Sequence, residues 1–188
     1  MKTLLILLTT CCLFSVQAQY EYEPNDEYPF GRINPEAPKE VSDFAALIGE
    51  CKCKSVARID QNTWADSVDM IWRWKYIMNG WGVQDETLKA DGTHSGSIRQ
   101  FNADSSSWYV HYYSNATPLP TLSSWEGGMK GDNIVLYKDQ TSPGGIDGYY
   151  RLTFSNISNK GFNWVGEWVT KDETSFIYPT WKIFCKRE

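Results

Sequence analysis

Hydrophobic and polar residues alternate along most of the chain after residue 49, which predicts β-strands rather than helices. Aromatic and β-branched residues occur in short runs, separated by clusters of Gly, Asn, Asp, Ser and Pro. Because the predicted turns are short, consecutive strands should pair as an antiparallel meander. The predicted strands are residues 50–59, 68–78, 81–88, 95–102, 107–114, 122–129, 133–139, 148–156, 161–169 and 176–186.

One face of this sheet should be aromatic, because side chains two residues apart in a strand share a face. In the second strand this face holds Met70, Trp72, Trp74, Tyr76 and Met78. Near the C-terminus it holds Phe162, Trp164, Gly166, Trp168, Trp181, Ile183 and Cys185. Closing the meander into a barrel would bury this face and remove the edge strands. We therefore expect an all-β fold, a single antiparallel up-and-down β-barrel of about 8–10 strands with a short N-terminal helix.

The helix is predicted just before the first strand. Val41, Phe44, Ala45 and Ile48 fall on one helical face, and Gly49 stands where a helix would stop. Residues 19–40 form an acidic, proline-rich leader with no hydrophobic period, which indicates an extended or disordered segment. The barrel domain should therefore occupy residues 41–188.

The first eighteen residues resemble a secretory signal peptide. Lys2 precedes an interrupted apolar run, and small residues lead to a cleavage position near Ala18. The run is too short to span a membrane, which takes about 20 apolar residues. We expect an exported protein, periplasmic or secreted; the alternative is a lipoprotein cleaved before Cys11.

The net charge of the chain indicates which classes of partner are unfavourable. The chain has a net charge of −5, and without Lys2 the 17 basic and 23 acidic residues give −6. The charges are spread along the chain with no basic cluster, a surface that repels nucleic acid and anionic lipid. We expect no nucleic acid partner, no membrane span, no cofactor and a monomeric protein.

Three cysteines remain after the predicted cleavage: Cys51, Cys53 and Cys185. Export favours one disulfide and one free thiol. The first and last strands of a closed barrel are neighbours, so Cys185 should pair with Cys51 or Cys53. We weakly favour Cys51. A zinc site is the alternative, but Cys-Lys-Cys is an unusual ligand spacing, so no metal is expected.

The chain resembles lipocalin-like (calycin-type) domains of exported bacterial proteins over roughly residues 44–188. The resemblance rests on distributed motifs: Leu47-Ile48-Gly49-Glu50, Trp72-Arg73-Trp74-Lys75-Tyr76, Ser97-Ile98-Arg99-Gln100-Phe101-Asn102, Trp125-Glu126-Gly127-Gly128, Arg151-Leu152-Thr153-Phe154-Ser155, Phe162-Asn163-Trp164 and Trp181-Lys182-Ile183. It implies an internal cavity that holds a small, largely apolar ligand.

The leading hypothesis is therefore a binding protein for a small hydrophobic or amphipathic molecule. Inward aromatic side chains suit a flat apolar ligand, and an inward Arg99 or Arg151 could bind a ligand carboxylate or phosphate. The opposite interpretation is that the aromatics fill the core and that the arginines point outward and pair across strands. The candidate ligand-binding residues are Trp72, Trp74, Tyr76, Arg99, Tyr112, Arg151, Trp164, Trp168 and Trp181.

Two other functions are compatible with this sequence. An isomerase or hydrolase could use His111 as general base with Glu167 or Asp85 orienting it, although no nucleophile motif accompanies them. A carbohydrate or surface-interaction module would need exposed aromatics, for which Trp64, Trp81 and Trp125 are the available tryptophans.

Overall fold

The computed structural model describes residues 20–187, so the predicted signal peptide at residues 1–18 and the alternative cleavage before Cys11 lie outside the described residues. The secondary-structure elements are η1 (Lys39–Leu47), β1 (Gly49–Ala57), β2 (Val68–Ile77), β3 (Gly82–Lys89), β4 (His94–Asn102), β5 (Ser107–Ser114), β6 (Ser123–Lys130), β7 (Asn133–Thr141), β8 (Asp147–Ser158), β9 (Gly161–Thr170) and β10 (Ile177–Lys186). All ten predicted strands are present, and each boundary lies within two residues of its expected position.

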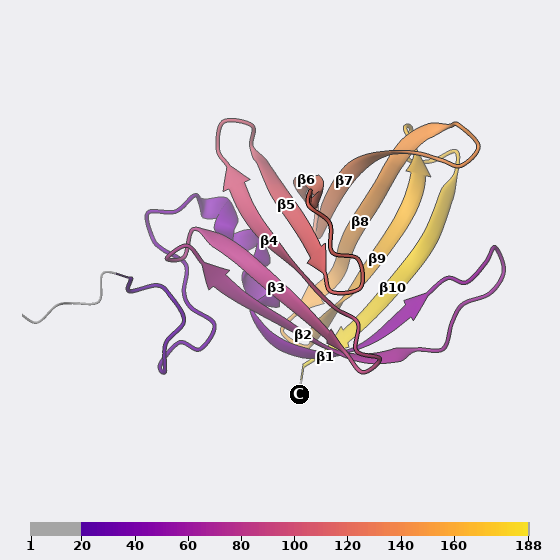
Figure 1. Cartoon of the computed structure of the whole chain (residues 1–188). Coiled ribbons are helices and arrows are strands. Elements are labelled where there is room, and N and C mark those ends of the chain that lie inside the picture. The colour runs from indigo at the N-terminus through magenta and orange to yellow at the C-terminus, as the bar shows by residue number, and fades with distance from the viewer. Residues whose placement is uncertain (1–19, 188) are drawn as a thin grey trace, which may run out of the picture.

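The ten strands form one closed antiparallel barrel (Figure 1). Each strand pairs with the next along the chain, and β1 pairs with β10 to close the sheet. The seam between them runs from Lys52 opposite Lys186 to Ala57 opposite Trp181. The expected up-and-down barrel is confirmed, and the closure leaves none of these strands with an unpaired edge.

Alternation in the strands places the aromatic face inside. Met70, Trp72, Trp74 and Tyr76 are all buried on β2. Met78, expected on the same face, is instead half exposed, because β2 ends at Ile77 and Met78 lies in the turn with a φ of 54°. Inside the barrel most ring pairs are edge to face or tilted, such as Trp72 and Trp74 with centroids 5.3 Å apart, whereas Phe44 stacks on Trp74.

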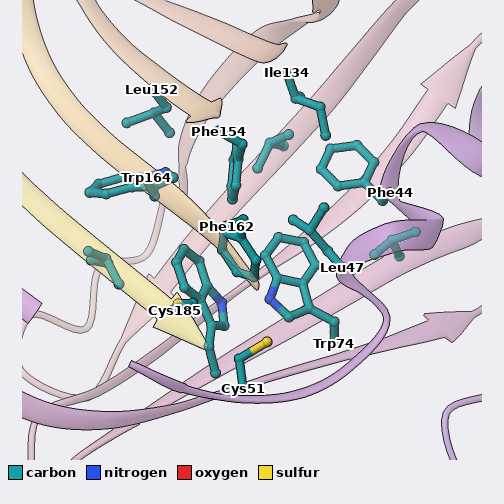
Figure 2. Close-up of a cluster of buried hydrophobic side chains, with 14 of the residues drawn as sticks. Phe44, Leu47, Cys51, Trp74, Ile134, Leu152, Phe154, Phe162, Trp164 and Cys185 are labelled. Atoms are coloured by element: carbon teal, nitrogen blue, oxygen red, sulfur yellow. The ribbon is translucent and has the colours of Figure 1, made fainter. Parts of the chain in front are cut away.

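The helix η1 covers one end of the barrel (Figure 1) and is a 3-10 helix. Its buried residues are Val41, Phe44 and Leu47, a spacing of three that matches three residues per turn. Figure 2 shows Phe44 and Leu47 directed toward the barrel aromatics, and the Phe44 ring lies 4.8 Å from that of Trp108. The helix thus closes this end of the barrel with hydrophobic side chains.

The leader is a series of turns and irregular segments attached to the same end of the barrel. The Tyr76 amide donates to the Phe30 carbonyl at 2.9 Å, and the Tyr22 amide donates to the Asn79 side chain at 2.9 Å. These contacts hold the described part of the leader, residues 20–38, against the β2–β3 turn. The structure thus gives the described leader a turn-rich conformation that is tied to the barrel by these hydrogen bonds.

A disulfide joins Cys53 to Cys185 across the β1–β10 seam, so the weak preference for Cys51 was wrong. Both cysteines of β1 face inward, but only Cys53 lies opposite Cys185 in the register, with 4.1 Å between the Cα atoms. Cys51 lies two residues away and is a free, buried thiol. The Arg187 Nε donates to its sulfur at 3.2 Å.

Candidate ligand cavity

A cavity of about 160 Å³ lies inside the barrel, beyond the rings that pack against η1. Side chains from eight strands, β2 to β6 and β8 to β10, line it. They are Trp72, Asp85, Thr87, Ser95, Ser97, Arg99, Val110, Tyr112, Trp125, Tyr150, Leu152, Phe154, Trp164, Trp181 and Ile183. The cavity therefore has an aromatic and aliphatic wall on most strands and a polar wall on β3 and β4.

The aromatic wall is held in a fixed arrangement by ring contacts and by hydrogen bonds to the indole nitrogens. The Trp164 and Trp181 rings pack edge to face with centroids 5.2 Å apart. The Trp181 Nε1 donates to the Ser55 hydroxyl at 2.8 Å, and the Trp125 Nε1 donates to the Tyr150 carbonyl at 3.2 Å. These partners fix the ring orientations before any ligand binds.

The polar wall contains a buried ion pair between Asp85 on β3 and Arg99 on β4. Each side chain is 3% exposed. The second Asp85 oxygen accepts a hydrogen bond from the Trp72 Nε1 at 2.7 Å. A buried carboxylate and a buried guanidinium are stable in such a site only when paired and hydrogen-bonded, which is the case for Asp85.

Arg99 is held by rings as well as by Asp85. Its guanidinium carbon lies 4.3 Å from the Trp74 ring centroid and 5.3 Å from that of Phe44. A guanidinium over an aromatic face is attracted by the ring quadrupole, and the attraction is stronger when water is excluded. The Phe44 contact links the helix that closes the barrel to the polar wall of the cavity.

A wider recess, about 670 Å³, lies at the other end of the barrel and is called here the mouth recess. Trp168, Phe176 and Tyr178 line it, together with loop residues from 142–146. Tyr150 lines both this recess and the inner cavity, and its hydroxyl is 2.7 Å from the Thr180 hydroxyl. Burial raises the pKa of Tyr150, so its phenol stays protonated and able to make this bond.

The structure places the predicted ligand-binding residues in four different environments. The inner cavity is lined by Trp72, Arg99, Tyr112, Trp164 and Trp181. Trp74 and Tyr76 are buried but are not among the residues that line it. Trp168 lines the mouth recess, where its Nε1 donates to the Gln140 carbonyl at 3.0 Å. Arg151 lies on the outer face.

Arg151 points outward and pairs with a residue of the neighbouring strand, as in the interpretation that assigns the arginines no ligand. It contacts Glu167 at 2.8 Å, directly opposite on β9, and Glu173 at 3.0 Å. This cluster holds the loop that contains Glu173 against the outer surface of the barrel. Glu167 is therefore engaged by Arg151 and faces away from the cavity.

The candidate catalytic residues are not brought together. His111 lies on the outer face of β5, and its Nδ1 is 2.8 Å from the Ser124 hydroxyl. Glu167 is four strands away around the barrel, and Asp85 is inside, paired with Arg99. In the described part of the chain no hydrogen bond joins His111 to either carboxylate, so the arrangement needed for acid–base chemistry is missing there.

Several residues that line the cavity were not among the predicted ligand-binding residues, chiefly Ser97, Tyr150 and Trp125. Trp125, named above as available for an exposed aromatic platform, lines the cavity, and its ring centroid lies 6.4 Å from that of Tyr150. The inward direction of Asp85 could have been predicted from the sequence. Val83, Asp85 and Thr87 are two residues apart on β3 and therefore share a face, so a buried valine implies an inward aspartate.

Volume alone does not select the site. A larger recess, about 910 Å³, is lined by residues of β1, β2, β3 and β10, where Lys54 and Lys186 are exposed to solvent. Residues 20–187 contain no group of three His, Cys, Asp or Glu side chains that could hold a metal ion. None of the helices formed by these residues is long and apolar enough to cross a membrane.

Comparisons with known proteins place the chain in no family. No protein-family model matches the sequence. No curated protein matches it either. Among solved structures, it is similar to a redesigned β-barrel with 11% sequence identity and a TM-score of 0.33, over 81% of this chain and 99% of that chain. Function must therefore be inferred from the cavity itself.

Proposed function

We propose that the protein binds a small, largely apolar molecule inside the barrel. The observation that carries this proposal is the cavity of about 160 Å³, with an aromatic wall facing a buried Asp85–Arg99 pair. Ligand sites are typically apolar with a few placed polar groups, and they occur preferentially in the mouths of β-barrels. A core serving only for stability would gain more by filling this space.

The barrel ends support a single route for the ligand. The helix closes one end with Phe44 and Leu47, which are fully buried. The mouth recess lies at the other end and shares Tyr150 with the cavity. We infer that the ligand enters through the mouth recess and passes Tyr150. A lipocalin-like relationship agrees with this arrangement and is part of the proposal.

We also propose that the protein works in an oxidising compartment outside the cytoplasm. The Cys53–Cys185 disulfide supports this, because such bonds persist mainly in exported proteins. The signal-like character of residues 1–18 points the same way.

The test is native mass spectrometry of the protein purified from its own host without refolding. A bound compound should appear as a defined mass increment that denaturing conditions remove. The variant Ser97→Phe should lose the increment, because Ser97 is 7% exposed and lines the cavity. The matched control is Ile98→Phe, since Ile98 points outward and is 38% exposed. An unliganded wild type, or equal loss in both variants, would contradict the proposal.

A further inference from the structure

The Arg99 guanidinium has five N–H donors but only two hydrogen bonds to the residues that the structure describes. The side chain is 3% exposed and lines the cavity. One terminal nitrogen pairs with Asp85, and the other lies 3.5 Å from the Ser97 hydroxyl. The Nε finds no acceptor among residues 20–187. A buried donor left unpaired is unfavourable, so this group calls for an explanation.

The neighbouring polar groups bond with one another and not with the Arg99 Nε. The Thr87 and Ser95 hydroxyls are 2.6 Å apart, and the Thr87 hydroxyl also donates to the Ser95 carbonyl at 3.3 Å. Both oxygens of Asp85 are engaged, one by Arg99 and one by the Trp72 Nε1. An acceptor from a bound molecule would satisfy Arg99 without breaking these bonds.

The charge balance of the cavity favours a neutral acceptor over an anionic one. Asp85 already neutralises Arg99, so a ligand carboxylate would add an uncompensated negative charge to a buried site. Lys89 and Lys138 also lie on the inner face, with their ammonium groups 4.4 Å from the Trp181 ring centroid and 5.2 Å from that of Trp125. Neither lysine lines the cavity, so neither is placed to contact a ligand carboxylate directly.

The size and the walls of the cavity indicate the size and shape of the rest of the ligand. Its volume of about 160 Å³ is close to that of an engineered apolar cavity, about 150 Å³, that binds benzene. Trp72, Phe154 and Trp164 offer ring faces and edges to a flat partner. On the basis of the proposed function, we propose that the ligand is a neutral, single-ring compound whose carbonyl-type oxygen accepts a hydrogen bond from the Arg99 guanidinium.

Three probes of nearly equal shape separate the parts of this proposal. Acetophenone carries the neutral carbonyl, α-methylstyrene replaces that oxygen with a methylene group, and benzoate replaces the acetyl group with a carboxylate. Isothermal titration calorimetry gives a dissociation constant for each with the wild-type protein. We expect acetophenone and α-methylstyrene to bind and benzoate to bind more weakly than acetophenone.

A double variant removes the donor while keeping the site neutral. In Arg99→Met/Asp85→Asn the ion pair is gone, and the new amide oxygen can still accept from the Trp72 Nε1. The preference for acetophenone over α-methylstyrene, taken as the ratio of dissociation constants, should fall about tenfold or more relative to wild type. Comparing ratios cancels the different hydration of the two probes.

A measurement on the wild type protects the test if the variant does not fold. The ¹⁵N resonances of the Arg99 guanidinium should shift on addition of acetophenone and stay in place with α-methylstyrene. Binding of both neutral probes with an unchanged ratio in the variant, or with no selective shift at Arg99, would overturn the inference and leave the proposed function standing. If benzoate binds more tightly than acetophenone, the inference that the ligand's acceptor is neutral would be overturned. Failure of every probe to bind would overturn both proposals.

Discussion

The disulfide should provide a large part of the stability of the barrel. It connects residues 132 positions apart, and the chain-entropy relation for a loop of this length gives about 5 kcal/mol at 25 °C. A domain is stable by about 5–15 kcal/mol in total, so losing the bond should remove a third or more of the free energy of unfolding. The perturbation is the double variant Cys53→Ala/Cys185→Ala.

Urea denaturation followed by tryptophan fluorescence measures the effect. The unfolding midpoint should fall, and the urea dependence of the free energy should steepen, because an unfolded chain without the cross-link exposes more surface. Wild type in reductant should behave in the same way. Cys51→Ala is the matched control, expected to lose about 1 kcal/mol and to keep the slope. A loss in the double variant no larger than that of the control would refute this reasoning.

Three further changes test other parts of the structure. Phe44→Ala should lower the free energy of unfolding by about 3–5 kcal/mol because its ring is fully buried; a loss below about 1 kcal/mol in urea denaturation would show that the helix does not close the barrel. Tyr150→Phe should lower the free energy of unfolding by only about 1 kcal/mol in the same assay, because the Thr180 hydroxyl keeps its hydrogen bond to the Gly166 carbonyl. A loss above about 3 kcal/mol would contradict this expectation. Burial raises the pKa of Tyr76 to about 12, so the folded state keeps a proton that the unfolded chain releases near pH 10. Stability should therefore fall as pH rises from about 10 to 12, and a constant urea midpoint there would argue against it.

The strand pattern was predictable because its causes are local. Alternation of side chains and the short turns depend on residues near one another in sequence, so all ten strands could be located. The helix was also predicted, although its 3-10 geometry was not: Val41, Phe44 and Leu47 are three residues apart, and the sequence analysis chose Ala45 and Ile48 in place of Leu47. Closure followed from the need to bury one aromatic face.

Features that depend on register across the barrel were not predictable. Cys51 and Cys53 share a face, and only the alignment of β1 with β10 decides that Cys53 meets Cys185. Arg99 was equally ambiguous: on β4 the hydrophobic Ile98 faces solvent while Arg99 faces inward. Its inward direction is stable because Asp85 faces it from β3, a pairing that no local pattern contains.

The Asp85–Arg99 pair bears on function because stability does not explain it. Transferring both charges into the barrel costs desolvation energy that their attraction only partly offsets, and well-packed hydrophobic residues in place of a buried pair are frequently as stable or more so. A pair that holds Arg99 in place at the wall of a cavity, with guanidinium donors left unpaired among the described residues, is instead suited to recognising an acceptor. Asp85 then has a positioning role: it neutralises the arginine and fixes the direction of its remaining donors.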